Sequence, residues 1–559
     1  MGYTQKRHLV PSLVFLSFVH VACGNEEFGQ QELASSSTPY TYLSVASCAE
    51  KGAGQVEVAF TPGVTNLWQD FCSGDSAYQF SCRTSDMLAY RHPSCEHGCD
   101  KGKCLPPLYS VADFGAKGDG VSDDGPAFQA ALDAADGGGR GYIPTGSYLI
   151  RQTLLLGDHT EGYGDGPSSV LRRTKDKTLV NVLHNYISRG PEAGSCSQPT
   201  GYHGRILFMN RKYSCGTVGI TLHDFQIDGG LVTDTPDAVT IALSGTKDTH
   251  IHHLTLTDLP QDGIFMRNGG QNTLIENNVF DGYNMRWFNG GGVNVEMWSN
   301  ANYPTTADSP VIVRNNLFIG RGPAVCSNSK LMTCIRDSDC GSNGKCITEA
   351  IAVHAGIPNA TIPGSVPYMV VENNEIRLSN RNYAVVCKHC KNSRITGNHI
   401  SALPAVAPHS DDAASGRYSG IHVLGGDHVL VQNNTLLSNQ LKNDERGILV
   451  DSGTHVFVMN NYLEDRITRY ALDTVAVRTT TSFRLYKNQV VNCGGGNGIS
   501  IGGGCADFIP ETGYGSVLYN EVSTPTLVAP KFPLLIRKTP SIYLKGNTTS
   551  PSPNAKTEC

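Results

Sequence analysis

The chain has 559 residues, with 44 Lys and Arg against 50 Asp and Glu, and a formal net charge of −6. Charged residues make up only 17% of the chain and 61 residues are Gly, which disfavours coiled-coil and long-helix architectures. No basic excess exists to hold a polyanion, so nucleic acid is excluded as an expected partner. This length would ordinarily mean about three or four domains, but repeat folds depart from that relation.

The N-terminal residues 1–23 have the pattern of an export signal. Lys6 and Arg7 precede the apolar run LVPSLVFLSFVHVA, which is too short to span a bilayer and ends before Cys23. The sequence VACGN resembles a bacterial lipoprotein cleavage site, in which Cys23 would become the lipidated first residue. We therefore expect an exported protein, either a lipoprotein of the cell surface or outer membrane or a secreted protein. Membrane contact is expected only through this lipid.

Cysteine usage indicates an oxidising compartment, because most of the 18 Cys fall into local groups. After a flexible tether at residues 24–40, residues 41–106 are predicted to form a small module stapled by disulfides among Cys48, Cys72, Cys82, Cys95, Cys99 and Cys104. Further groups are Cys326, Cys334, Cys340 and Cys346, and the local pairs Cys196/Cys215, Cys387/Cys390 and Cys493/Cys505. The connectivity stays open. CKHC at 387–390 also has zinc-ligand spacing, but no second such pair stands nearby, and no metal site is predicted.

A repeated unit dominates the rest of the chain. Seven variants of it, such as NTLIENNVF, HVLVQNNTL and HVFVMNNYL, are short apolar strands followed by an Asn and a turn. Such a period indicates a solenoid, and strand-length units indicate a parallel β-helix. We predict an all-β, right-handed parallel β-helix over residues 107–545 and a C-terminal tail at 546–559. Identical Asn side chains on successive turns are expected to hydrogen-bond as a ladder: Asn278, Asn316, Asn374, Asn398, Asn434, Asn461 and Asn488.

The acidic stretch DFGAKGDGVSDDGPAFQAAL, residues 113–132, precedes the repeats. Asp123 or Ser122 can cap a helix that has Pro126 in its first turn. With the GGGRGYIPTGSYLI that follows, this pattern closely resembles the start of the pectate-lyase superfamily, in its polygalacturonase-like and epimerase-like branch. The resemblance implies a helix that covers the open end of the solenoid core. The loop has neither a phosphate-binding pattern nor the regular alternation of a calcium loop, so no cofactor is expected, with Ca²⁺ as the alternative left open.

The strand before each Asn unit should carry the chemistry, because alternation sends every second residue outward. Val293 and Val295, or Ile421 and Val423, should point inward. The outward row predicted from the same strands contains Arg267, Asn294, Glu296, His354, Lys388, His422 and Asp451. Of these, we assign Glu296, His354, Lys388, His422 and Asp451 as catalytic and Arg267 and Asn294 as substrate-binding. Asp411 and Asp412, in an inserted loop, join the substrate-binding group.

Two reactions fit this row. Glycoside hydrolysis needs two carboxylates, for which Glu296 could pair with Asp451 or Asp262. β-Elimination on a uronic acid needs a base for the C5 proton and a cation beside the carboxylate, which the His, Lys and Arg side chains could supply. We expect a polysaccharide partner that contains uronic acid. The polygalacturonase motifs and the Asp-Pro-His of mannuronan epimerases are absent, so no catalytic residue transfers from the resemblance, and a non-catalytic surface adhesin stays as the alternative.

Overall fold

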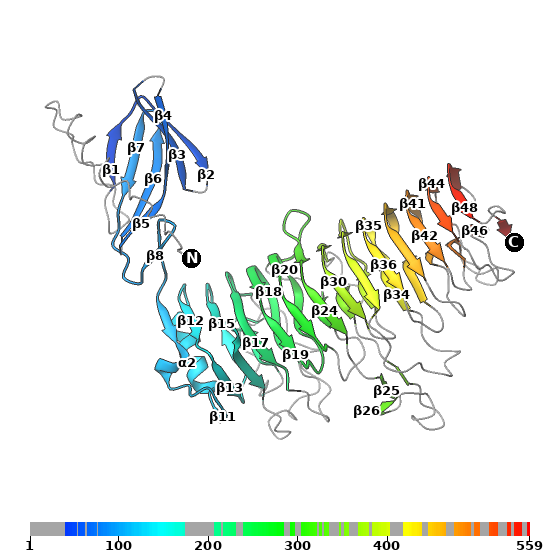
Figure 1. Cartoon of the computed structure of the whole chain (residues 1–559), viewed down its shortest axis with the longest axis horizontal. Helices are drawn as coiled ribbons and strands as arrows, with labels where there is room; N and C mark the ends of the chain where they lie inside the picture. The colour runs from blue at the N-terminus through cyan, green and yellow to red at the C-terminus, as the bar shows by residue number, and fades with distance from the viewer. Residues whose placement is uncertain are drawn as a thin grey trace, which may run out of the picture. The chain divides into compact units, whose positions relative to one another are not determined.

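The computed structural model describes residues 40–52, 54–61, 64–74, 76–173, 206–213, 216–230, 239–283, 291–296, 303–320, 324–326, 329–334, 346–347, 351–356, 367–378, 383–402, 418–438, 445–465, 474–492, 497–502, 514–523, 534–537, 542–550 and 556–558. The chain divides into two compact units, Met1–Pro107 and Leu108–Cys559. Both are drawn in Figure 1, and each is described here by itself. In the part of the chain so described, no helix is long and apolar enough to cross a membrane.

Unit 1 is a small, disulfide-stapled β-module, as the cysteine spacing predicts. It has a four-stranded antiparallel sheet in the order β1-β7-β6-β5, a three-stranded sheet β2-β3-β4 and the pair β8-β9. Disulfides join Cys48 to Cys82, Cys72 to Cys99 and Cys95 to Cys104. The strands are β1 Thr41–Ser44, β2 Ser47–Gly52, β3 Gln55–Thr61, β4 Val64–Gln69, β5 Phe71–Ser73, β6 Ser76–Thr84, β7 Met87–Arg91, β8 Cys99–Asp100 and β9 Lys103–Cys104.

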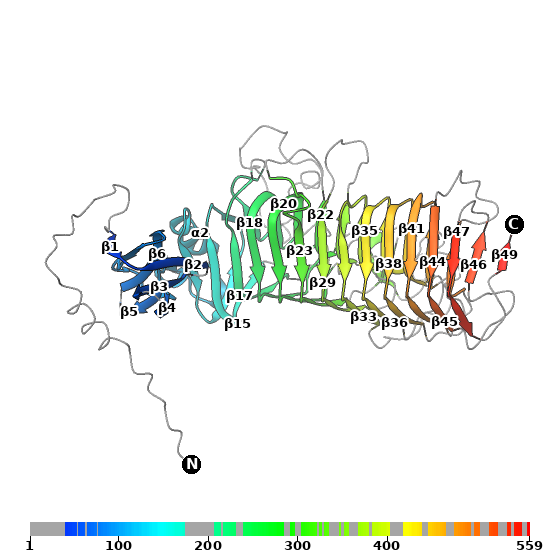
Figure 2. The same ribbon diagram turned by 90° about the horizontal axis from the view of Figure 1, so that it is seen from above.

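Unit 2 is the parallel β-helix, built as one continuous sheet of 37 strands. Each turn contributes strands to three parallel ladders, which we call the site, second and third ladders. Figure 2 shows β23, β29, β35, β38, β41, β44 and β47 of the second ladder side by side in chain order. Long strands turn a corner between ladders: β15 and β17 run from the second into the third, and β18 and β20 from the site ladder into the second.

The bounds of these strands are as follows. The site ladder contains β14 Leu154–Leu156, β16 Phe208–Asn210, β18 Ile241–His252, β20 Ile264–Glu276, β22 Gly291–Glu296, β28 Ile351–Gly356, β31 Tyr383–Lys388, β34 Tyr418–Leu424, β37 Glu445–Asp451, β40 Val475–Arg478, β43 Ile499–Ile501, β46 Leu534–Arg537 and β49 Lys556–Glu558. The second ladder contains β10 Leu108–Ser110, β12 Arg140–Ile143, β15 Glu161–Arg173, β17 Thr221–Asp228, β23 Val311–Arg314, β29 Met369–Glu372, β32 Arg394–Thr396, β35 Asp427–Gln432, β38 Thr454–Met459, β41 Ser482–Tyr486, β44 Tyr514–Leu518 and β47 Ile542–Lys545. The third ladder contains β11 Asp119–Asp123, β13 Gly146–Ile150, β19 Thr255–Thr257, β21 Val279–Asp281, β24 Leu317–Gly320, β30 Glu375–Leu378, β33 His399–Ala402, β36 Thr435–Ser438, β39 Tyr462–Asp465, β42 Gln489–Asn492, β45 Glu521–Ser523 and β48 Thr548–Ser550.

The pairing extends into the segment predicted as a tail, because β48 pairs with β45 and β49 with β46. A small antiparallel sheet stands apart from the three ladders, in the order β26-β25-β27. Its strands are β25 Ala324–Cys326, β26 Ser329–Cys334 and β27 Cys346–Ile347, so it is formed by the inserted segment that carries one of the predicted cysteine groups.

Alternation along the strands places the core as predicted. Val293, Val295, Ile421 and Val423 are fully buried and belong to one continuous apolar cluster that runs through the β-helix. Each turn leaves its apolar face incomplete, so burial depends on the next turn, as in other solenoids.

The asparagine ladder is present and is longer than predicted. Each ladder Asn donates from Nδ2 to Oδ1 of the next, at 2.9–3.0 Å, from Asn278 through Asn488 and on to Asn520 and Asn547. Each of these Oδ1 atoms also accepts the backbone N–H of the preceding ladder Asn, as Oδ1 of Asn316 does from Asn278. The residue before each ladder Asn is in the left-handed region, as at Asn277 and Asn460, which explains the recurring Asn-Asn pair. The ladder therefore satisfies polar groups that every turn would otherwise bury unpaired.

The acidic loop opens the solenoid, but its helix begins after Asp124 and not after the predicted caps Ser122 or Asp123. The N-cap of α2, Gly125–Ala135, is Asp124, whereas Ser122 and Asp123 lie in β11. The Asp124 carboxylate accepts N–H bonds from Lys117 and Gly118, so it ties the loop together instead of capping the helix. Asp119 likewise accepts from Val121 and Ser122, and these backbone bonds lower the pKa of its carboxyl to about 2.

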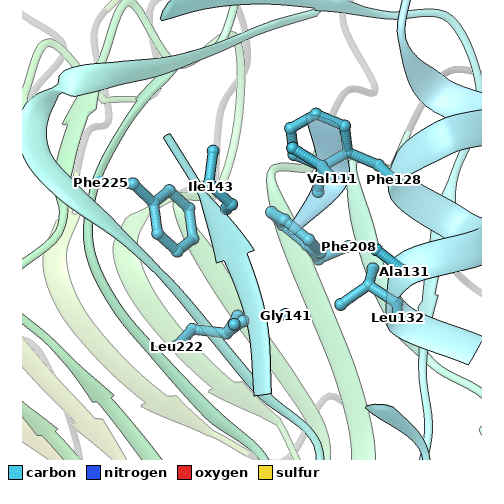
Figure 3. A pocket seen from close by; sticks show the side chains of 10 residues that line it. Val111, Phe128, Ala131, Leu132, Gly141, Ile143, Phe208, Leu222 and Phe225 are labelled. Carbon is cyan, nitrogen blue, oxygen red and sulfur yellow. The ribbon is translucent and has the colours of Figure 1, made fainter. Parts of the chain in front are cut away.

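Helix α2 packs over the first turns of the core, as the family resemblance implies. Phe128, Ala131 and Leu132 of α2 face a small apolar pocket, opposite Phe208 and Phe225. Figure 3 shows these side chains with Val111 of the 3₁₀ helix η1, Val111–Phe114, at the same end. The side chains that line this pocket are apolar, so we interpret it as the closed end of the hydrophobic core.

Candidate active site

The predicted outward residues form two columns on the site ladder, two positions apart, and not the single row expected. In the first column Asn294 of β22 stands beside His354 of β28, and Val386 separates His354 from His422. In the second column Arg267 of β20 stands beside Glu296. The other predicted members of this second column, Lys388 and Asp451, are separated by Leu424.

Not every outward position of the site ladder is polar. Phe265, Val386 and Leu449 point away from the core in the first column and are buried all the same. Phe265 belongs to a separate apolar cluster with Met209, Ala242 and three neighbours. The polar residues from Arg267 to His354 are thus bounded by apolar side chains, which lowers the dielectric around them.

Asn294 is the centre of the candidate site. Its Oδ1 lies 2.8 Å from Nδ1 of His354, and its Nδ2 donates to Oε1 of Glu296 at 3.3 Å. The Asn294 side chain also forms a hydrogen bond with Asp262. This bond lowers the pKa of the Asp262 carboxyl, as a bond donated by an amide does. Two carboxylates therefore fix the amide nitrogen on one side and leave Oδ1 for the imidazole. We call Asp262, Asn294, Glu296 and His354 the Asn294 cluster.

The orientation of Asn294 selects one tautomer of His354. Because an amide oxygen only accepts, Nδ1 of His354 must carry the proton and Nε2 must carry the lone pair. Burial, together with the charge of Lys388, lowers the pKa of His354 from 6.5 to about 4. The imidazole is consequently neutral at physiological pH, and Nε2 is in the form that a general base requires.

The two carboxylates of the cluster differ in environment. The Asp262 side chain accepts the Gly291 N–H at 2.6 Å and is 1% exposed. Burial, with a contribution from the charge of Glu296, raises the pKa of Asp262 well above its usual range. Glu296 is 15% exposed and lies 3.9 Å from Nδ1 of His354. Glu296 is exposed enough to contact a ligand, whereas the buried Asp262 side chain can contact only protein groups such as Asn294.

Arg267 is buried, so the structure gives it a supporting position beside Glu296. It is hydrogen-bonded to Tyr213, and this bond and the charge of Arg267 oppose the burial that raises the pKa of the Tyr213 hydroxyl. Its register partner is Glu296. Arg267 therefore lies on the strand next to Glu296, with Tyr213 as its hydrogen-bond partner.

Lys388 lies one turn beyond His354, at the end of β31. A Cβ placed on Gly356 would be 3.0 Å from Cε1 and Nε2 of His354 and 3.6 Å from Cβ of Lys388. The imidazole therefore lies over the bare backbone of Gly356, with the lysine stem next to it. This glycine gives the ring the room that any larger residue would occupy.

His422 and Asp451 lie away from this cluster. Asp451 is four turns from Glu296 along the ladder, about 19 Å at the usual strand spacing, so these two carboxylates cannot act on one glycosidic bond. Asp451 accepts a hydrogen bond from Thr479, and the His422 ring stacks on Tyr383. Asp411, Asp412 and Cys23 lie outside the described residues.

Tyr213 was not among the predicted site residues, and Asp262 was predicted only as a hydrolytic partner for Glu296. Tyr213 follows β16, two turns before Arg267, and nothing in its local sequence marks it. The local signal for Asp262 is its acidity, since the equivalent position two residues before the paired strand residue is Ser419 or Arg446 on later turns. CKHC holds a disulfide between Cys387 and Cys390, which occupies both sulfurs that the zinc alternative requires.

The fold and this face define a parallel β-helix whose outer surface carries a compact acid–base cluster. Two family models match the chain, one described as rhamnogalacturonase A/epimerase, pectate lyase-like, over residues 108–340. The other is described as a right-handed beta helix region and matches residues 359–512. The chain belongs to the pectate-lyase-like superfamily of right-handed parallel β-helix proteins.

Individual relatives are more distant or match only short segments. The chain is 28% identical over 207 residues to plasmin and fibronectin-binding protein A of Streptococcus pneumoniae, covering 36% of this chain and 27% of that protein. It is 47% identical over 78 residues to mannuronan C5-epimerase AlgE1 of Azotobacter vinelandii, covering 12% of this chain and 6% of the relative. Thus it spans well under half the length of either relative. The crystal structure of the S. pneumoniae surface adhesin PfbA aligns with a TM-score of 0.48 at 15% identity, covering 79% of this chain and 90% of that one.

Proposed function

We propose that this chain is an exported carbohydrate-active enzyme that cleaves a uronic-acid-containing polysaccharide by β-elimination at the Asn294 cluster. The observation that carries the proposal is the neutral imidazole of His354, held by Asn294 in the tautomer that leaves Nε2 basic. A lysine ammonium one turn away adds the cation that a uronate carboxylate needs.

In the proposed step, Nε2 of His354 takes the C5 proton of the uronate while Lys388 balances the charge that builds on the carboxylate. The C4–O4 bond breaks as the C4=C5 double bond forms, and the imidazolium returns the proton to O4. Asn294 keeps the imidazole oriented throughout, and Glu296 stabilises the transient imidazolium at 3.9 Å. Asp262, Arg267 and Tyr213 hold these groups in position.

Similarity to a mannuronan C5-epimerase and to the pectate lyase-like family model supports carbohydrate chemistry at C5 of a uronate. Export is supported by the signal-like pattern of residues 1–23. A lipid on Cys23 remains part of the proposal, and the alternative is a secreted protein.

The test is a substrate panel of alginate, polygalacturonate and glycosaminoglycans. β-Elimination produces an unsaturated uronate with its own ultraviolet absorbance, whereas hydrolysis produces reducing ends without it. We expect the absorbance to appear with one substrate class and to fall at least about a hundredfold in rate for His354→Gln. His399→Ala, an exposed histidine of the third ladder, is the matched control. Reducing ends without absorbance would replace elimination by hydrolysis.

The second candidate is a non-catalytic surface adhesin, which the 28% identity over 207 residues to a plasmin and fibronectin-binding protein favours. An adhesin needs no acid–base group. Binding to a polysaccharide or to fibronectin that His354→Gln leaves intact, with no product from any substrate, would establish this candidate and end the enzymatic proposal.

A further inference from the structure

Two histidines and an aspartate meet at the corner between β34 and β35, on the β-helix but outside the Asn294 cluster. One ligand atom from each of Asp427, His428 and His455 lies within 4.8 Å of the others. Nδ1 of His428 is 2.7 Å from Oδ1 of Asp427, and Nδ1 of His455 is 3.5 Å from the same oxygen. Both imidazoles thus direct a nitrogen at one carboxylate.

The repeat itself creates this arrangement. The segments GGDHV and SGTHV are 27 residues apart, and β35 pairs with β38 in the register that places His428 beside His455. Both histidines are in the left-handed region, with φ of 54° and 52°, and their rings stack at 4.3 Å. Asn392 occupies the position equivalent to His428 on the preceding turn; its backbone is also left-handed, but its side chain is an amide. The two histidines therefore come from consecutive turns with the same backbone geometry.

We propose that Asp427, His428 and His455 form a binding site for a divalent transition metal of the zinc class. Two imidazole nitrogens with one carboxylate oxygen suit Zn²⁺, whereas Ca²⁺ prefers oxygen ligands alone. The side chains are 39%, 52% and 47% exposed, so a bound ion keeps coordination positions open to water or to a ligand. Because the ligands come from two turns, the ion cross-links them.

The test uses the full chain without a histidine tag, freed of metal with a chelator, and titrated calorimetrically with Zn²⁺ alone. We expect one Zn²⁺ to bind, and His428→Ala and His455→Ala each to weaken the affinity at least about tenfold. Asp427→Asn should weaken it too, while His399→Ala should not. Ca²⁺ in place of Zn²⁺ should give no binding at this site.

A second measurement separates binding here from binding elsewhere. Zn²⁺ should raise the Tm of the wild-type chain and leave the Tm of the His428→Ala, His455→Ala double variant unchanged. Equal Zn²⁺ affinity in wild type and double variant would overturn the site, and so would no Zn²⁺ binding by the wild type. Polysaccharide cleavage is expected to be unaffected by the double substitution, so this outcome is independent of the proposed function.

Discussion

His354 shows how one residue's environment decides its chemistry. An ordinary histidine is half-protonated near pH 6.5. Here burial and Lys388 lower the pKa to about 4, and Asn294 fixes the tautomer. The outward position of His354 was predictable from the strand pattern, but its protonation state was not, because Asn294 and Glu296 come from the turn before His354 and Lys388 comes from the turn after it.

This pKa makes a prediction about pH. Between pH 6.5 and about 4 the unfolded chain binds a proton at His354 that the folded chain does not, so stability from this residue falls as the pH falls through that window. The Tm of the wild type should therefore decrease more between pH 7 and pH 4.5 than the Tm of His354→Gln. The measurement is Tm against pH for both.

Protonation of His354 should also set the acidic limb of the pH profile of kcat/KM. We expect kcat/KM to hold down to about pH 5 and to fall near pH 4. Lys388→Met should move this limb to higher pH, since it removes a charge that opposes protonation of His354. Lys391→Met, on the same turn, is the control and should leave the limb in place. If Lys388→Met leaves the acidic limb in place, the charge of Lys388 does not influence the pKa of His354.

Gly356 gives a second prediction at this scale. Gly356→Ala would place a methyl group 3.0 Å from the His354 ring and displace it, so kcat should fall at least about tenfold with KM changing less. Far-ultraviolet circular dichroism should be unchanged. In a double-mutant cycle, adding Gly356→Ala to His354→Gln should cost little further activity, because both act through the same ring. Additive losses would mean that the glycine serves something else.

Among the elements, the asparagine ladder has the strongest link from sequence to structure. The seven Asn predicted to stack do so, because a period in sequence becomes a column in space once strands pair in register. The helix cap was less predictable. Ser122, Asp123 and Asp124 are all good capping residues, and only the pairing of β11 with β13 decides which one begins the helix.

Asn461→Ala tests the ladder. Asn461 accepts the N–H and Nδ2 of Asn434 and donates to Val431 and Asn488, all in a buried setting. Removing it leaves several buried groups unpaired, which should lower the free energy of unfolding by about 2–5 kcal/mol. Asn460→Gly, in the same dipeptide, keeps the left-handed backbone and should cost less than about 1 kcal/mol. Chemical denaturation of both variants is the measurement, and equal losses would contradict a special role for the ladder.

At the scale of the whole molecule, the two units should respond differently to reduction. The disulfides of unit 1 close loops with sequence separations of 34, 27 and 9 residues. The buried core of this unit is small and consists of Val45, Cys48, Val56, Val58, Phe80 and Leu88. Cys387–Cys390 in unit 2 has a separation of only 3 and constrains little.

We therefore expect a reducing agent to unfold unit 1 and to leave the β-helix folded. Limited proteolysis with mass spectrometry should locate new cleavage sites between residues 40 and 107 only. The oxidised chain under the same protease is the control. New cleavage within the asparagine ladder after reduction would show that the β-helix also depends on its disulfides.

The sequence by itself determined the β-helix, its inward residues and the asparagine ladder, because each of these depends on a local period that repeats down the chain. It also predicted the outward polar residues of the site ladder, since these alternate with inward apolar ones. Only the tertiary structure decided which of those residues meet. The register places Arg267, Glu296 and His354 on neighbouring strands, and it places Asp451 four turns from Glu296, in line with the several turns that the repeats predict. The contacts of Tyr213 and Asp262, and the meeting of His428 with His455 at one corner, likewise depend on how turns stack.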